Sequence, residues 1–147
     1  MVLECPLCSR LQSLEGDPYS IHNFKHTAAV LSGQQGPAGW CTLIYVEHVE
    51  HLAQLTSNVQ AEIFGEVARV AQAIRAVFGP VRLNYECLGN VCPHIHWHVI
   101  PRHANDPTPA ATVWGWPAPA LLGNVSHEER VAMVASLREA LLNGEEP

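Results

Sequence analysis

The chain of 147 residues has little positive charge, with eight lysine and arginine residues against fourteen aspartate and glutamate residues. Lys25 is its only lysine, and the formal net charge is -6 at pH 7. Proteins that hold a long polyanion need many phosphate contacts from a basic surface. We therefore expect no long nucleic acid among its partners, whereas a small phosphorylated ligand needs only a few local donors.

Membrane segments and export signals are also lacking. No apolar run approaches the roughly 20 residues that a helix needs to cross a bilayer. Residues 1–5 lack the charged and apolar regions of a secretory signal. Five cysteines, an odd number, in such a chain indicate thiols or metal ligands rather than a disulfide framework. These absences predict a cytoplasmic protein with no membrane contact.

The length and a hydrophobic content of 48% are typical of one domain of ordinary size, so we expect a single domain over residues 1–147. Two apolar runs, residues 26–31 and 40–46, flank a loop rich in glycine and glutamine, which predicts a β-hairpin. Residues 81–88 and 94–100 are two further strand patterns, and we expect them to pair because only a short connection separates them.

The clearest helix begins near Thr56 or Ser57, where a hydroxyl can cap free backbone N–H groups, and Gly79-Pro80 ends it. Its apolar residues recur every three or four positions, as one helical stripe requires. The stripe consists of Val59, Ile63, Val67, Val70, Ile74 and Val77.

A second helix is predicted near the C-terminus, where Ser126 and Glu129 have the spacing of a capping box. The segment 104–123 before it is dense in proline, alanine and glycine, which predicts an irregular crossing over the surface. Two helices and several sequential strands favour an α+β domain with an antiparallel sheet. The buried stripe of the second helix is predicted at Val131, Val134, Leu137 and Leu141.

The most informative segment is His94-Ile95-His96-Trp97-His98-Val99-Ile100. Because side chains alternate along a strand, its three histidines should share one face, backed by apolar residues on the other. A neutral imidazole is a good nucleophile towards phosphorus near neutral pH, since its ordinary pKa is about 6.5. Alternating histidines can also chelate a metal ion such as zinc. The spacing alone leaves catalysis and metal binding about equally favoured.

The alternating histidines, preceded by Gly89-Asn90 and followed by Pro101-Arg102, resemble the signature of the histidine triad (HIT) nucleotide hydrolases and transferases. Residues 83–93 resemble the lead-in of the bacterial members. The resemblance implies the HIT-like fold, an antiparallel sheet with one long helix and a C-terminal helix. It also implies a homodimer that pairs through the long helix and an adjacent strand.

The resemblance implies roles for the histidines. His96 would be the nucleophile, which forms a covalent nucleotidyl-imidazole that water then resolves. His98 would contact the phosphate beside it, and Arg102 after the strand is expected to be solvated. The other substrate-binding residues that the family pattern implies are Asn84, Gly89 and Asn90.

Cys5-Pro6-Leu7-Cys8 holds two thiols at a spacing that can grip one metal ion, which is half of a site. Some HIT proteins and the related galactose phosphate uridylyltransferases, which this chain resembles here, complete such a pair with two histidines. The corresponding residues are His48 and His94. The resemblance thus implies a structural zinc site that would fix the histidine strand. Without a metal, the two thiols would be redox-active or inert.

Two positions depart from the family pattern. Trp40 stands where relatives commonly have a fourth histidine, so support for the catalytic imidazole from that side is missing or supplied otherwise. Val91 stands where many relatives have Ser or Thr, so no hydroxyl protonates the leaving group.

Cys41 and Cys87 lie in strand patterns and are predicted to be small buried residues.

We therefore expect a small nucleotide substrate and attack on its α-phosphate through His96. Hydrolysis of dinucleoside polyphosphates or nucleoside phosphoramidates is the first interpretation, because water is always present and no acceptor site is visible. A nucleotidyl transferase or phosphorylase is the nearest alternative. The alternative from a different functional class is a protein without catalytic turnover, which binds nucleotides or is a zinc-stabilised interaction protein. Trp40 and Val91 keep this alternative open because they depart from the family pattern.

Overall fold

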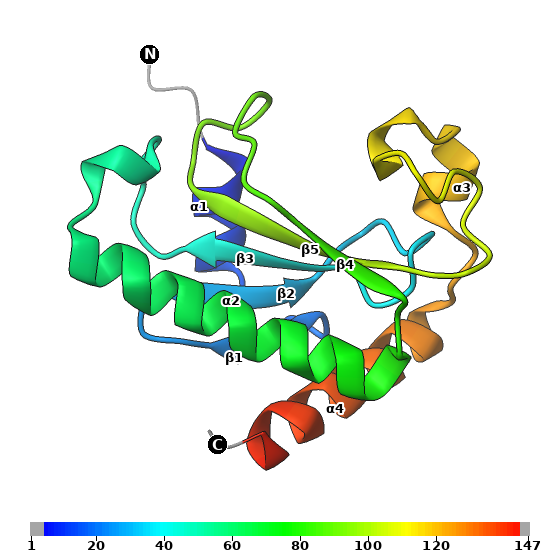
Figure 1. The fold of residues 1–147 in the computed structure, drawn as a ribbon. Coiled ribbons are helices and arrows are strands. Elements are labelled where there is room, and N and C mark those ends of the chain that lie inside the picture. The colour runs from blue at the N-terminus through cyan, green and yellow to red at the C-terminus, as the bar shows by residue number, and fades with distance from the viewer. Residues whose placement is uncertain (1–4, 145–147) are drawn as a thin grey trace.

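The computed structural model describes residues 5–144, and its centre is an antiparallel sheet (Figure 1). The sheet has five strands in the spatial order β1-β2-β3-β5-β4, and every neighbouring pair is antiparallel. The predicted α+β class with an antiparallel sheet is confirmed. The strands are β1 (Ser20–Asn23), β2 (Thr27–Leu31), β3 (Cys41–Tyr45), β4 (Arg82–Glu86) and β5 (His96–Arg102).

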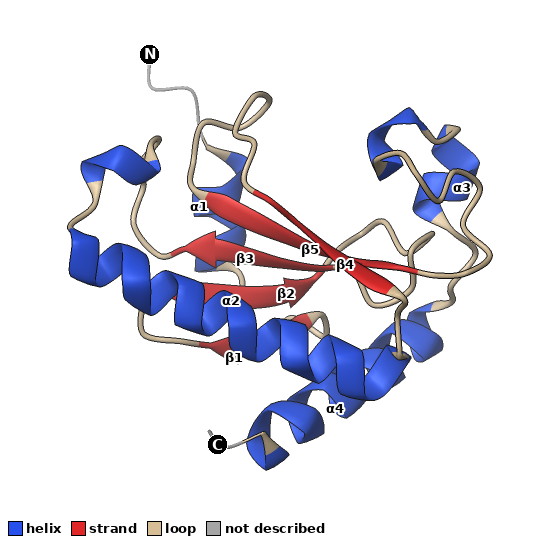
Figure 2. Ribbon diagram, in the orientation of Figure 1, coloured by secondary structure: helices blue, strands red, loops and turns tan. Residues whose placement is uncertain are grey.

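Helices cover the sheet unequally (Figure 2). The two longest, α2 and α4, pack against each other and against one face, where the main hydrophobic core lies. The opposite face of the sheet is flanked by α1 near one end and by the segment that contains η2 and α3 near the other. None of the helices within residues 5–144 is long and apolar enough to cross a membrane. The helices are α1 (Pro6–Gln12), α2 (Ser57–Phe78), α3 (Ala118–Leu122) and α4 (His127–Asn143), with 3-10 turns η1 (Leu52–Gln54) and η2 (Val113–Gly115).

The helix ends follow the local sequence. The side chain of Thr56 accepts a hydrogen bond from the backbone of Val59 at the start of α2, and Gly79 ends this helix with a φ of 55°. Ser126 and Glu129 form the predicted reciprocal capping box of α4. Both predicted helix starts are therefore confirmed, because a capping side chain acts within one turn and needs no tertiary contact.

Several sequence-based predictions are wrong where distant segments decide burial. Val131 is exposed, because α4 turns Val134, Leu137 and Leu141 towards the core instead. Cys87 is exposed just beyond the end of β4, whereas Cys41 is buried as predicted. The segment 104–123 is less irregular than expected, since it contains η2 and α3.

The strand register places the histidines. Trp97 and Val99 of β5 belong to the main core, beneath α2. His96 and His98 alternate with them and lie on the opposite face, where they pair with Ile44 and Thr42 of β3. The prediction that three histidines share one face holds for His96 and His98. It is wrong for His94, which precedes β5 and turns its buried ring towards Cys5 and Cys8.

Arg102, predicted to be solvated, is buried at the end of β5. Its guanidinium donates to the carboxylate of Asp106 at 2.7 Å and to the side-chain oxygen of Asn84 at 2.9 Å. It also donates to the main-chain oxygens of Ala111 and Thr108, at 2.7 and 3.0 Å. One buried cation thereby attaches the loop after β5 to the sheet.

Replacing Arg102 with alanine should lower the free energy of unfolding by about 3–5 kcal/mol, because it leaves the buried Asp106 carboxylate without its partner. Urea unfolding monitored by circular dichroism measures this loss. The matched control is Arg82→Ala, which removes the exposed arginine that pairs with Arg102 in the register of β4 and β5. Equal stabilities of the two variants would contradict the anchoring role.

Candidate active site and metal centre

His96 lies at the start of β5 and is partly exposed. Its Nδ1 lies 2.6 Å from the main-chain carbonyl oxygen of His94. A carbonyl oxygen only accepts hydrogen bonds, so Nδ1 of His96 carries a proton and donates it. In the neutral ring, Nε2 then holds the lone pair, which is the form that a nitrogen nucleophile needs.

His98 is the neighbour of His96 on the same face, with their ring centroids 5.0 Å apart. Two tryptophans surround it. The ring of Trp40 lies edge-on at 5.5 Å and that of Trp114 edge-on at 5.4 Å. Burial, with a smaller contribution from the nearby His96, lowers the pKa of His98 to about 4. His98 is therefore neutral at physiological pH.

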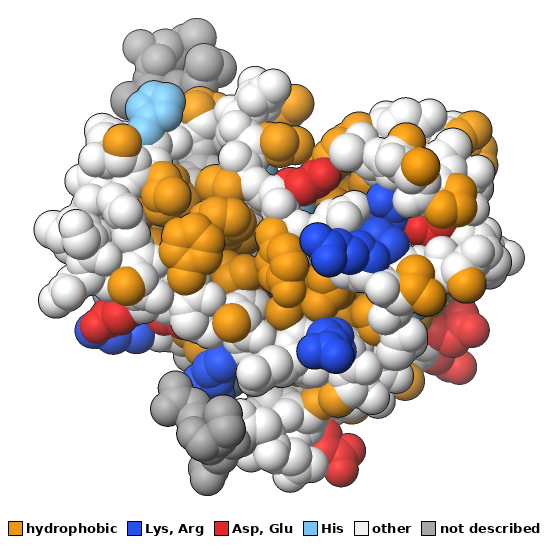
Figure 3. All heavy atoms as spheres, in the orientation of Figure 1, with side chains coloured by type: hydrophobic (Ala, Val, Ile, Leu, Met, Phe, Trp, Pro, Cys, Tyr) orange, Lys and Arg blue, Asp and Glu red, His pale blue; other side chains and the backbone are white. Residues whose placement is uncertain are grey.

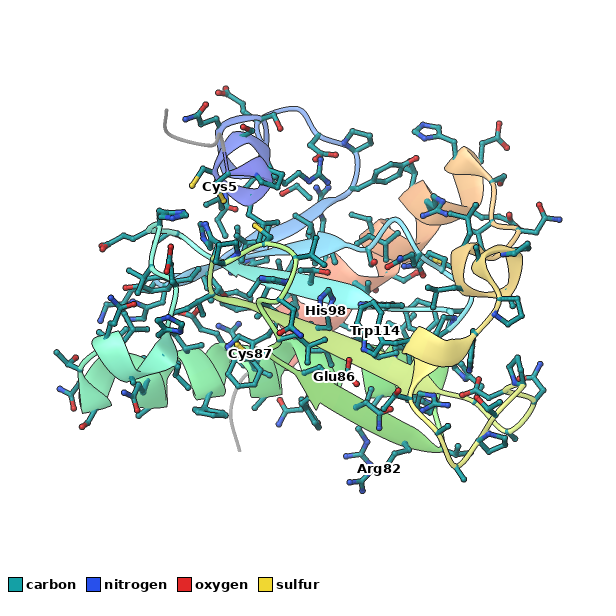
Figure 4. All side chains as sticks on the ribbon, turned by 90° about the horizontal axis from the view of Figure 1, so that it is seen from above. Cys5, Arg82, Glu86, Cys87, His98 and Trp114 are labelled. Atoms are coloured by element: carbon teal, nitrogen blue, oxygen red, sulfur yellow. The ribbon has the colours of Figure 1, made fainter. Side chains whose placement is uncertain are left out.

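Trp114 comes from η2, in the loop that Arg102 attaches to the sheet. Its indole N–H donates to the carboxylate of Glu86 at 2.6 Å, and Figure 4 shows Trp114 beside His98 with Glu86 close by. Glu86 itself pairs with His98 in the register of β4 and β5. Sequence reasoning missed Trp114 as a site residue, since nothing local in a proline-rich loop indicates which strand it covers.

The structure distributes the residues predicted to bind substrate over β4 and the loop after it. Asn84 lies on β4, and its side-chain oxygen is occupied by Arg102. Gly89 has a φ of 75°, a conformation that glycine adopts without strain, and Asn90 is exposed beside it. Their contact with a substrate stays a prediction. Val91 is fully exposed in the same loop.

The residues predicted to bind zinc converge on one point beyond the start of β5. The ligand atoms of Cys5, Cys8, His48 and His94 all lie within 4.8 Å of one another. Three of their separations are 3.4 Å (Cys5 Sγ to His94 Nδ1), 3.4 Å (Cys8 Sγ to His48 Nδ1) and 3.5 Å (Cys8 Sγ to His94 Nδ1). Zinc bonds of about 2.0 Å to nitrogen and about 2.3 Å to sulfur imply tetrahedral edges of about 3.5 Å, so the residues fit a metal ion.

His94 is prepared as a ligand by its surroundings. It is fully buried, and its Nε2 lies 2.7 Å from the main-chain oxygen of Tyr45. That oxygen can only accept, so Nε2 carries the proton and Nδ1 presents its lone pair to the two cysteines. Metal-binding histidines typically donate their other ring N–H to a carbonyl or carboxylate oxygen in this way.

A third thiol borders the cluster, since Cys92 Sγ lies 3.6 Å from Cys5 Sγ. Burial raises the pKa of Cys5, but hydrogen bonds from the backbones of Cys8 and Leu7 and from the Cys92 thiol lower it below its usual range. Burial and the neighbouring Cys5 raise the pKa of Cys8. A metal ion in the cluster would hold both sulfurs as thiolates, because only a thiolate is a good ligand.

The sheet and helices have the fold of known histidine triad proteins. A histidine triad protein from Sinorhizobium meliloti 1021 superposes with a TM-score of 0.74 at 26% identity, covering 87% of this chain and 93% of that one. A zinc-bound histidine triad family protein from Mycobacterium smegmatis has a TM-score of 0.68 at 21% identity, covering 96% of this chain and 95% of that one.

Residues 15–105 match the HIT domain, and the chain belongs to this family. It is also similar to "Protein hit" of Bacillus subtilis, with 31% identity over 88 residues. This match spans 56% of the chain and 61% of the length of that relative. The family predicted from the alternating histidines is therefore confirmed.

Proposed function

We propose that this protein hydrolyses nucleotide conjugates at the α-phosphate and that His96 is the nucleophile. The observation that carries the proposal is the hydrogen bond from His96 Nδ1 to the His94 carbonyl, which leaves the Nε2 lone pair on the partly exposed face of the sheet. Membership of the HIT family supports the same chemistry.

In the first step, Nε2 of His96 attacks the α-phosphorus. A bond forms between nitrogen and phosphorus, while the bond to the leaving group breaks and its electron pair departs with that group. The ring becomes positively charged, and the carbonyl of His94, already bonded to Nδ1–H, stabilises that charge. Water then attacks the phosphorus and loses a proton to solvent. The nitrogen–phosphorus bond breaks, its electron pair returns to Nε2, and the nucleoside monophosphate departs from the neutral imidazole.

The proposed substrates are dinucleoside polyphosphates or nucleoside phosphoramidates. Val91 offers no hydroxyl to protonate a departing atom and is fully exposed. A leaving group that is stable as an anion, such as a nucleoside polyphosphate, therefore suits the site better than an amine does. A nucleotidyl transferase or phosphorylase would use the same intermediate with another acceptor, and a nucleotide-binding protein without turnover would not form it.

Replacing His96 with alanine should lower turnover at least about a thousandfold while nucleotide binding stays measurable, because the covalent route needs the imidazole. The assay follows mononucleotide release from a panel of dinucleoside polyphosphates and phosphoramidates. Release without added phosphate indicates hydrolysis, and a requirement for phosphate indicates phosphorolysis.

The matched control for this variant is His51→Ala, which removes an exposed histidine outside the site. Unchanged turnover of the His96 variant would refute the nucleophile. Bound nucleotide without product from the wild type, over the whole panel, would favour the non-catalytic alternative.

We also propose that the Cys2His2 cluster holds a structural zinc ion. Four protein ligands fill a tetrahedral shell, so the ion would contribute stability rather than bind substrate. It would tie the N-terminal segment with α1 to the residue that precedes β5. Figure 4 shows Cys5 beside α1, apart from His98 of β5 and Trp114 of η2.

Protein purified without added zinc should contain about one equivalent by elemental analysis, and chelation should lower its melting temperature. Cys8→Ser should lose the metal, whereas Cys87→Ser, which alters an exposed thiol outside the cluster, should retain it. Metal-free wild-type protein whose melting temperature does not respond to chelator would contradict this assignment.

We further propose a homodimer formed through α2 and β4. Strand β4 is last in the sheet order, so its outer edge has no partner within the described residues. Figure 3 shows hydrophobic side chains gathered over α2 and β4. Phe64, Val81 and Tyr85 are 51%, 70% and 50% exposed there, which is a large apolar area for a monomer to leave in water.

Sedimentation velocity should give the mass of a dimer for the wild type and that of a monomer for Phe64→Glu, because a buried unpaired carboxylate disfavours association. Val131→Glu places the same charge on an exposed apolar residue of α4 and should leave the dimer intact. A monomeric wild type at micromolar concentration would contradict the proposal.

A further inference from the structure

We infer that Trp40 fixes His98 in the neutral form whose proton is on Nε2, which makes His98 a hydrogen-bond donor to the substrate phosphate. Trp40 is thus a positioning residue, which acts through His98. The role in the reaction rests on the proposed function, whereas the position of the proton does not.

The two atoms that decide this are Trp40 Nε1 and His98 Nδ1, which lie 3.2 Å apart. An indole N–H is a donor with no acceptor capacity, so Nδ1 of His98 must supply the lone pair. A neutral imidazole with its lone pair on Nδ1 carries its proton on Nε2. A doubly protonated ring cannot accept this bond.

The indole has no alternative partner. Trp40 is 0% exposed, so its N–H cannot turn to water, and breaking the bond to His98 would leave a buried donor unsatisfied. The ring packs in a cluster with Ile100, Val113 and Trp116, and Gln35 donates to the main-chain oxygen of Trp40 at 2.9 Å. Packing and hydrogen bonding therefore hold the indole N–H towards His98.

Neighbouring rings consequently have opposite tautomers. His96 donates through Nδ1 and keeps its lone pair on Nε2, whereas His98 accepts through Nδ1 and keeps its proton on Nε2. A phosphate group facing both would meet one nucleophile and one donor. With the other tautomer, His98 would turn a lone pair towards the anionic phosphate and would compete as a second nucleophile. The hydrogen bond from Trp40 excludes this tautomer and so prevents both effects.

The surroundings of His98 support a ring that stays neutral. Burial and the adjacent His96 lower its pKa to about 4. Glu86, which lies opposite His98 on the neighbouring strand β4, already accepts a hydrogen bond from the indole N–H of Trp114. A histidine at position 40 could donate or accept a hydrogen bond. A tryptophan there can only donate, so it holds His98 in a single tautomer.

The direct test is long-range 1H–15N NMR of protein labelled with 15N-histidine, with the His98 signals assigned by their loss in His98→Asn. The wild type should show a protonated Nε2 and an unprotonated Nδ1. Trp40→Phe, which keeps an aromatic ring without the N–H, should shift His98 towards a mixture of tautomers. Trp114→Phe removes the other nearby indole N–H, which bonds to Glu86, and should leave the His98 tautomer unchanged.

A proton on Nδ1 of His98 in the wild type would overturn the inference, and this outcome does not depend on any variant folding. An unchanged tautomer in folded Trp40→Phe would also overturn it. On a substrate that the wild type turns over, Trp40→Phe should lower kcat about a hundredfold with a smaller change in KM. If the predicted tautomer is found but His96→Ala retains turnover, the proposed function fails while the assignment of the proton stands.

Discussion

A main-chain carbonyl oxygen accepts hydrogen bonds and cannot donate them, and this asymmetry decides how two of the three histidines are used. The carbonyl of Tyr45 accepts a hydrogen bond from His94 Nε2, which leaves Nδ1 to face the cysteines. The carbonyl of His94 accepts a hydrogen bond from His96 Nδ1, which leaves the lone pair on Nε2. The indole of Trp40 has the opposite asymmetry and faces His98. The three imidazole rings thus differ in which nitrogen carries the proton and which carries the lone pair.

These bonds also connect the Cys2His2 cluster to His96. A metal ion on His94 Nδ1 would fix that ring, and the carbonyl of the same residue orients His96. Strand β3 contributes from the other side, because Tyr45 donates its N–H to the carbonyl of Ile95 at 3.0 Å while its own carbonyl accepts from His94. A zinc ion held by the cluster would therefore affect the proposed catalysis through the orientation of His96, with no contact to the substrate.

Much of this arrangement follows from local sequence. Alternation along β5 places His96 and His98 on one face. The spacing of Cys5 and Cys8 indicates half of a metal site, whereas its two histidines are implied by the family resemblance alone. The helix starts at Thr56 and Ser126 depend on side chains within one turn. Burial of Arg102 does not follow locally, because its partners lie in a loop whose path Arg102 itself helps to fix. Trp114 escaped sequence reasoning for the same reason.

The central claim is tested most directly by trapping the intermediate. Protein mixed with a dinucleoside polyphosphate, quenched at high pH within the first turnover and digested, can be examined by peptide mass spectrometry. The account predicts a nucleoside monophosphoryl group on His96 alone. The same group on His98, or product formed in a single turnover with no modified histidine, would contradict it.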